Sequence, residues 1–198
     1  MKINEIISSV DKETIEEIFE KHFTAISDID IDNNGYISSS DTISLRSTIS
    51  QLPVKFLKVD ETFLCVGKKL VSLDGCPKEV GKDFYCYINK LSSLKGGPIT
   101  VNRLYNCSKN PLKSLEGLPK QIGGQFTLSY SNDLPLLRLL TLTNFNFDNH
   151  SNIKYAFDIM VILLKYAGQG RKAALDCAAD LLSLGKKLDI DLTRNARW

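Results

Sequence analysis

The sequence has few of the features on which most enzymes and membrane proteins depend. Only two histidines and one tryptophan occur among 198 residues, and the formal net charge at pH 7 is +2. A net charge so close to zero gives no long-range field that favours nucleic acid. No apolar run approaches the roughly 18–20 residues of a membrane span, and Met1 to Glu5 lack the apolar stretch of a secretory signal. These absences predict a cytoplasmic protein that binds neither nucleic acid nor a membrane.

The chemically reactive residues form no catalytic or metal-binding pattern. His22 and His150 lie far apart in the sequence and belong to no Ser/His/Asp or Cys/His arrangement. The glycine pairs at Gly96 and Gly123 are not followed by Lys-Ser or Lys-Thr, which excludes a phosphate-binding loop. Three of the five cysteines fall at regular intervals rather than in a disulfide framework. We therefore expect no enzymatic activity and no cofactor.

The dominant pattern is an internal repeat between Ile49 and Leu136, in which similar residues recur at one fixed step. The columns that keep this step are Leu52, Leu73, Leu94 and Leu115; Leu70, Leu91 and Leu112; Phe63, Phe84, Tyr105 and Phe126; Cys65, Cys86 and Cys107; Gly75, Gly96 and Gly117; Pro77, Pro98 and Pro119; and Val59, Val80, Val101 and Ile122. A fixed step of about 21 residues is typical of a solenoid, in which stacked coils share one continuous core.

One coil shows what each position does. Its pattern is Phe84-x-Cys86-x-x-Asn89-x-Leu91-x-x-Leu94, which matches the leucine-rich repeat spacing L-x-L-x-x-N-x-L-x-x-L. Side chains two apart on a strand point the same way, so Phe84 and Cys86 face inward while Tyr85 and Tyr87 face outward. The amide of Asn89 should satisfy backbone groups at the buried turn. Because so short a coil leaves little room for a full helix, the outer return path is expected to be extended or a short 3₁₀ helix.

Residues 51–115 resemble phage-encoded and bacterial leucine-rich repeat proteins of the short-repeat type. The segments that carry the resemblance are Leu52 to Phe56, Leu73 to Val80, Asn89 to Leu91, and Leu115 to Ile122. The resemblance implies an α/β repeat fold, a leucine-rich solenoid of about five coils, and a binding scaffold rather than a fixed activity. It also implies a phage or prophage protein that binds a host protein, and could inhibit it, in the host cytoplasm.

The two ends of the chain leave the repeat. Residues 1–41 are predicted to form an N-terminal cap, with a helix from Asp11 to Phe23 and a hairpin turn at Asn34-Gly35. Residues 42–142 are the solenoid, and residues 143–198 a C-terminal helical hairpin that covers its open end.

The C-terminal helices are predicted from their apolar stripes. The first stripe consists of Ile153, Phe157, Met160, Leu164 and Ala167. The second consists of Leu175, Ala178, Leu181 and Leu182, with Gly185 as the end of that helix. Trp198 is expected to dock on this cap, because a disordered end is more often polar.

A calcium-binding loop is an alternative interpretation of residues 30–41. The loop fits the EF-hand spacing, with oxygen ligands at Asp30, Asp32, Asn34, Ser38 and Asp41. Position 12 of the loop is aspartate, which is short for a bidentate ligand, and the residues after it alternate as a strand does. A hairpin within the N-terminal cap is therefore the competing interpretation.

The concave strand face is the predicted binding surface. The residues assigned to it are Leu64, Val66, Asp83, Tyr85, Tyr87, Leu104, Asn106 and Thr127. Exposed apolar groups on one sheet face, with tyrosines as anchors, are typical of an interaction patch. The main hypothesis is thus a protein-binding module. A structural or assembly protein of a phage particle remains a further alternative.

Overall fold

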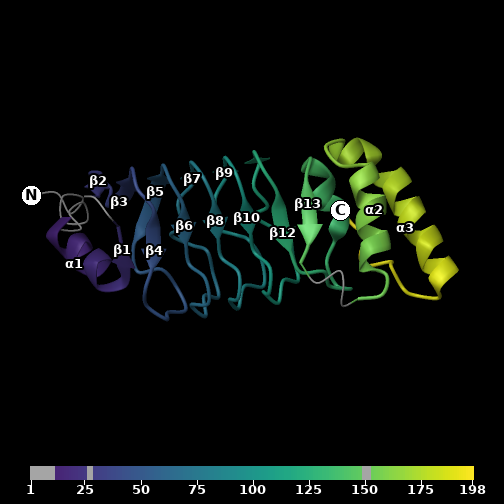
Figure 1. Cartoon of the computed structure of the whole chain (residues 1–198), viewed down its shortest axis with the longest axis horizontal. Helices are drawn as coiled ribbons and strands as arrows, with labels where there is room; N and C mark the ends of the chain where they lie inside the picture. The colour runs from purple at the N-terminus through teal and green to yellow at the C-terminus, as the bar shows by residue number, and fades with distance from the viewer. Residues whose placement is uncertain (1–11, 26–28, 149–152) are drawn as a thin grey trace, which may run out of the picture.

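The protein is an elongated solenoid with helices at both ends (Figure 1). The computed structural model describes residues 12–25, 29–148 and 153–198. Helix α1 (Lys12–His22) stands at one end, and helices α2 (Ala156–Lys165) and α3 (Ala174–Leu188) stand at the other. Short strands stack between them, coil upon coil. The prediction of a repeat solenoid of about five coils is confirmed.

Two sheets run along the solenoid, and most coils contribute one strand to each. Sheet A contains, in spatial order, β1 (Phe23–Thr24), β4 (Ile43–Leu45), β6 (Phe63–Leu64), β8 (Phe84–Tyr85), β10 (Tyr105–Asn106), β12 (Phe126–Leu128) and β13 (Phe145–Phe147). Sheet B contains β2 (Asp30–Ile31), β3 (Tyr36–Ser39), β5 (Lys55–Val59), β7 (Glu79–Val80), β9 (Thr100–Val101) and β11 (Gln121–Ile122). Among the strands described, only the β1–β4 and β2–β3 pairs are antiparallel. The outer return path is thus extended, as expected, and pairs from coil to coil.

The core is a continuous aromatic stack enclosed by the repeat's leucines and cysteines. Neighbouring ring centroids lie 5.8 Å apart between Phe63 and Phe84, 4.9 Å between Phe84 and Tyr105, and 5.2 Å between Tyr105 and Phe126. All four side chains are fully buried. Because the parallel register sets each ring on the one before it, every coil buries its apolar face only against its neighbours.

A buried asparagine closes the turn after the sheet A strand, as predicted. The Asn89 amide donates to the carbonyl oxygens of Cys65 and Cys86 at 2.8 and 2.9 Å. Its Oδ1 accepts from the backbone N–H groups of Lys68 and Leu70 at 2.9 and 3.0 Å. Asn110 repeats the arrangement one coil later, toward the carbonyls of Cys86 and Cys107. Each amide therefore satisfies backbone groups of two successive coils.

One turn column has a left-handed backbone conformation that was not among the predictions from the sequence. Gly67, Ile88 and Lys109 occupy the same place in successive coils, and their φ angles are 67°, 57° and 54°. This left-handed region suits glycine but is strained for a β-branched residue. Ile88 is also 48% exposed, so packing compensates it only in part.

At the N-terminal end, α1 packs against the first coils. Its buried residues are Ile15 and Phe19, and Phe19 stacks on Phe23 with centroids 5.3 Å apart. The predicted start of this helix at Asp11 lies outside the described residues. The predicted hairpin is confirmed, since β2 pairs antiparallel with β3 across the turn at Asn34-Gly35.

The predicted faces of the C-terminal helices were right only in part. Met160 of α2 and Leu181 of α3 are buried, as their stripes predicted. Phe157 and Leu164 of α2 are instead 53% and 38% exposed, and the other buried residues of this helix are Ala156, Ile159 and Leu163. Leu175 of α3 is 84% exposed. Helix α2 carries apolar residues all round, so their spacing alone does not select the buried side.

Gly185 does not end α3, as the sequence had suggested, but lies buried inside it. A Cβ at Gly185 would stand 2.8 Å from the carbonyl oxygen of Ile190. The glycine therefore permits the returning chain to pass close to the helix, and Asp189, with φ of 55°, forms the cap instead.

Trp198 docks elsewhere than predicted. The tail runs beside the 3₁₀ helix η2 (Leu136–Thr141), where the N–H groups of Leu136 and Leu137 donate to the carbonyls of Asn195 and Arg197 at 3.1 and 3.2 Å. Trp198 thus lies near η2 and the last coil rather than on the helical hairpin.

Replacing Ile88 with glycine should stabilise the fold. The substitution removes the strain of a non-glycine residue in the left-handed region, which is about 1–2 kcal/mol. It also costs about 0.5–1 kcal/mol, because glycine loses more conformational entropy on folding. We expect the free energy of unfolding of Ile88→Gly to rise by up to about 1 kcal/mol in urea titrations. The matched control is Gly67→Ile, which should lower it, because a Cβ there meets no atom within 4 Å and only the backbone conformation opposes it. If both variants have the same free energy of unfolding as wild type, the backbone of Ile88 is not strained.

Removing the Asn89 amide should be costly. Asn89→Ala removes the partner of the Lys68 and Leu70 N–H groups and of the Cys65 carbonyl, whereas the Cys86 carbonyl keeps its hydrogen bond from Asn110. Each buried unsatisfied group costs about 1–3 kcal/mol. Allowing for relaxation, we expect a loss of about 3 kcal/mol in the free energy of unfolding. Asn102→Ala, at an exposed position, serves as the control and should change stability by less than about 0.5 kcal/mol. A small effect at Asn89 would show that water replaces the amide.

Candidate interaction face on sheet A

The strand register sets one row of side chains across the whole of sheet A. Thr24 is paired with Ser44, Ser44 with Leu64, and Leu64 with Tyr85. The row continues through Asn106 and Thr127 to Asn146. Side chains at paired positions of neighbouring strands stand side by side. The result is a line of uncharged groups, with Leu64 and Tyr85 as its largest members.

The residues predicted from the sequence are all found on this face. Leu64, Val66, Asp83, Tyr85, Tyr87, Leu104, Asn106 and Thr127 are each partly exposed, between the fully buried inward residues of their strands. Their alternation with Phe63, Cys65, Phe84 and Cys86 confirms the predicted inward and outward sides of the coil.

Tyr85 and Tyr87 form an aromatic pair at the centre of the face. Their ring centroids lie 6.3 Å apart and the rings meet edge to face, with an interplanar angle of 86°. Partial burial raises the pKa of the Tyr85 hydroxyl, and the nearby Asp83 carboxylate raises it further. The Tyr85 phenol is therefore a neutral hydrogen-bonding group at physiological pH, mounted on a ring that neighbouring side chains hold in place.

Asp83 plays a structural part on this face. Its side chain is only 13% exposed. Its Oδ1 accepts from the backbone N–H of Leu104 at 3.0 Å, and Arg103 Nε lies 3.8 Å from the same atom. The carboxylate thus fixes the entry to β10, and the adjacent arginine offsets its charge.

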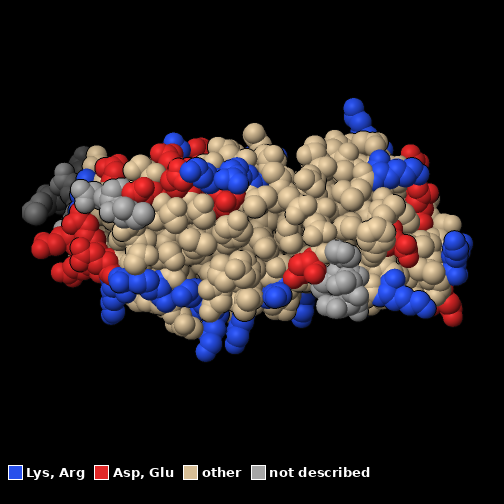
Figure 2. All heavy atoms as spheres, in the orientation of Figure 1, with Lys and Arg blue, Asp and Glu red and all other residues tan. Residues whose placement is uncertain are grey.

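Charged groups border the strands rather than cover them. Figure 2 shows a band of uncharged atoms along the middle of the molecule, over the strands of Figure 1, with Lys, Arg, Asp and Glu gathered above, below and at the ends. An uncharged strip bordered by charged groups resembles the arrangement of many protein-binding surfaces, whose centre is depleted of charge and whose rim is polar.

Sequence reasoning missed Ile88 at the border of this face. It follows Tyr87 directly, is 48% exposed, and holds a left-handed φ. Strained and exposed apolar residues gather at functional sites. The signal was present in the repeat, since the same position one coil earlier is Gly67, which marks the column as a left-handed turn.

The five residues of the proposed calcium loop are arranged as a hairpin. Asp30 and Ser38 face one another across the β2–β3 pair. Asp32 Oδ1 accepts from the N–H groups of Asn34 and Tyr36 at 2.8 and 2.9 Å and so stabilises the turn. The residues that follow Asp41 form strand β4 instead of the second helix of an EF-hand. Within the described residues, no three His, Cys, Asp or Glu side chains gather in a way that could hold a metal ion.

The cysteines are buried free thiols and offer no reactive centre. Cys65, Cys86 and Cys107 stack in the core, and Cys76 and Cys177 are buried elsewhere. Burial raises the pKa of the Cys76, Cys86 and Cys107 thiols well above the ordinary value, and that of Cys177 to about 12. His22 Nδ1 shares a 2.9 Å hydrogen bond with Ser47 Oγ, and His150 lies outside the described residues.

Comparison with protein families, curated proteins and solved structures gave no match to this chain. Among the described residues, no helix is both long and apolar enough to span a membrane.

The buried thiols predict a loss of stability at alkaline pH. In the unfolded chain a thiol ionises near its ordinary pKa of about 8.5, whereas in the folded chain Cys76, Cys86 and Cys107 stay protonated. Their contribution to stability is therefore complete below about pH 8.5 and is lost as the pH rises, by up to about 1.4 kcal/mol per pH unit for each thiol.

Urea titrations at pH 8 and pH 10 measure this loss directly. Cys86→Ala should show a smaller difference between the two pH values than wild type does. A free energy of unfolding that does not change over this range would contradict the burial of the thiols.

Proposed function

We propose that this chain is a non-enzymatic protein-binding module of the short leucine-rich repeat class, and that it binds its partner through the outer face of sheet A. In this proposal α1 with the β2–β3 hairpin, and α2 with α3, are the caps of the solenoid. The observation that carries the proposal is the Tyr85–Tyr87 pair. The two rings meet edge to face, and Tyr85 stands in the middle of the uncharged row that the strand register sets across sheet A.

The chemistry of the face supports a protein as the ligand. Tyrosines combine a large apolar area with a hydrogen-bonding hydroxyl and lose little conformational entropy on binding, which makes them common anchors. Aliphatic side chains lie around the pair, namely those of Leu64, Val66 and Leu104. Backbone hydrogen bonds to the preceding coil support both anchors, since the N–H groups of Cys65 and Gly67 donate to the carbonyls of Tyr85 and Tyr87. The surface is therefore already ordered before the partner arrives, which lowers the entropic cost of association.

We further propose a host protein as the partner, bound in the host cytoplasm by a phage-encoded chain that inhibits it. The support for this step is the resemblance of residues 51–115 to phage and bacterial leucine-rich repeat proteins.

Affinity capture from a bacterial lysate tests the proposal. The bait proteins are wild type, Tyr85→Ala/Tyr87→Ala, and the control Leu57→Ala/Ile99→Ala. The control removes two apolar side chains, each 46% exposed, that belong to the sheet B side of the coils. Wild type and the control should retain the same protein. The tyrosine variant should lose it by at least about a thousandfold in affinity, since two anchor residues cost at least about 2 kcal/mol each.

Two outcomes would contradict the proposal. Capture by the tyrosine variant at wild-type strength excludes the tyrosine pair as the anchor. Capture lost only from the Leu57/Ile99 variant moves the binding surface to sheet B. Circular dichroism of all three proteins confirms that the solenoid is intact in each.

A further inference from the structure

The two sheets do not end together at the C-terminal end of the solenoid. Sheet A continues past β12 to β13, whereas sheet B stops at β11. The chain that follows β12 forms the 3₁₀ helix η2 before it reaches β13, in the stretch where the earlier coils form a sheet B strand. Strand β11 is therefore the open edge of a parallel sheet.

The hydrogen bonds of sheet B show which backbone acceptors at this edge have no donor. The N–H of Ile99 donates to the carbonyl of Lys78 at 2.8 Å, and the N–H of Lys120 donates to the carbonyl of Ile99 at 2.9 Å. Asn102 likewise donates to Val80, and Gly123 to Val101, at 3.0 and 2.9 Å.

The next acceptors in these two series are the carbonyls of Lys120 and Ile122. Neither accepts a hydrogen bond within the part of the chain that the structure describes. Both carbonyls can therefore accept hydrogen bonds from the N–H groups of one more parallel strand.

The burial of Ile122 supports the same conclusion. The register places it in one column with Val59, Val80 and Val101. Those three valines are at most 1% exposed, because strands flank them on both sides, whereas Ile122 is partly exposed. An added strand would complete its burial as the other coils complete that of the valines.

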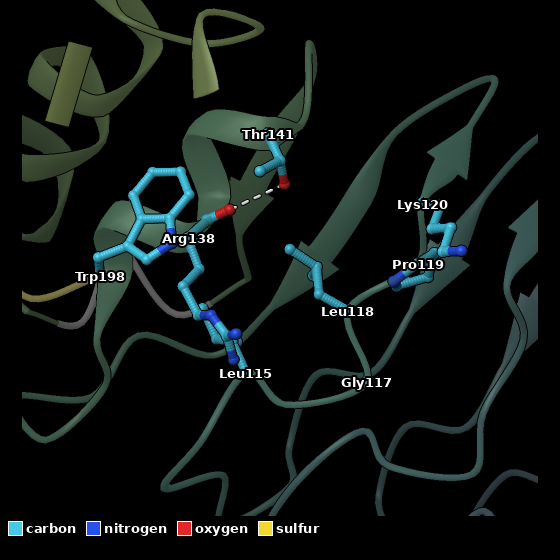
Figure 3. Close-up of a pocket in the computed structure, with 8 residues that line it drawn as sticks. All are labelled: Leu115, Gly117, Leu118, Pro119, Lys120, Arg138, Thr141 and Trp198. Atoms are coloured by element: carbon cyan, nitrogen blue, oxygen red, sulfur yellow. Dashed lines mark hydrogen bonds between the residues drawn. The ribbon is translucent and has the colours of Figure 1, made fainter. Parts of the chain in front are cut away.

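A hollow of about 360 Å³ adjoins this edge (Figure 3). Leu118, Pro119 and Lys120 line one side of it, and Arg138, Thr141 and Trp198 line the other. Leu118 points across the gap toward η2, and the Trp198 indole lies alongside η2. The lining holds two cationic side chains and no carboxylate side chain, so its charge favours an acidic group.

We propose that the β11 edge and this hollow form a second docking site, which takes an extended segment of a partner protein that carries an acidic side chain. The segment adds to sheet B as a further parallel strand, and its N–H groups donate to the carbonyls of Lys120 and Ile122. Its acidic side chain stands beside Lys120 and faces Arg138. This site is separate from the face of sheet A and does not depend on it.

The repeat itself supplies a probe for this site. The probe is a peptide of residues 97–103 with both ends blocked, in which Ile99→Glu sets an acid at the position that pairs with Lys120 in the sheet B register. The matched control is the same peptide N-methylated at positions 99 and 102, whose N–H groups are the expected donors. A second control carries lysine at position 99.

Titration of the full chain is followed by amide NMR shifts and by Trp198 fluorescence. The acidic peptide should shift the amides from Lys120 to Gly123 and change the emission of Trp198. The N-methylated peptide should shift neither, and the lysine peptide should bind more weakly. Lys120→Ala and Arg138→Ala should each weaken binding by about threefold, the effect of losing one exposed ion pair.

Three results would overturn the proposal. The first is no shift at β11 at millimolar acidic peptide. The second is equal binding of the N-methylated peptide, which shows that the edge carbonyls are not used. The third is tighter binding by Lys120→Ala, which shows that this lysine protects the edge against added strands.

Discussion

The fold depends on hydrogen bonding at buried turns. Each short coil must reverse direction around an apolar centre, and its turning backbone is shut away from water. Asn89 and Asn110 solve this with one side chain each, which serves carbonyl and N–H groups of its own coil and the coil before. Because each amide bridges two coils, the same interaction that closes a turn also sets the stacking register. The aromatic stack, the thiol column and the rows of outward side chains all follow from that register.

The register also explains why the two sides of the protein differ in what they offer. On sheet A it lines up side chains, so recognition there depends on the residue chosen at each outward position. At the proposed site on sheet B the last strand presents backbone carbonyls, which do not depend on the side chains of the strand. Selectivity for one segment over another would therefore come from the few side chains around Trp198. The two sites that we propose lie on separate sheets, so binding at one leaves the other accessible in this proposal.

Most of the repeating part could be predicted from the sequence, because its contacts recur at one fixed step. The inward residues, the role of Asn89 and the N-terminal hairpin all follow from spacing. Ile88 could have been found by extending the Gly67 column, and the Gly97–Tyr105 pair by comparing coils. The other coils carry Cys76 or Leu118 with a phenylalanine eight positions later, whereas Gly97 makes room for the longer tyrosine, whose hydroxyl would be 3.3 Å from a Cβ there. The ends resisted prediction, because the buried faces of α2 and α3, the close approach at Gly185 and the docking of Trp198 depend on contacts that occur only once.

The position of Trp198 has a spectroscopic consequence. It is the only tryptophan in the chain and lies at one end of the solenoid, 36% exposed, while the stacked rings of Phe63, Phe84, Tyr105 and Phe126 occupy the interior of the coils. Its emission therefore reports the environment of the last coil, whereas far-ultraviolet dichroism averages over all of them. Stacked coils need not melt together. Comparing the unfolding curves from the two signals therefore measures how cooperatively the coils unfold, without an added label.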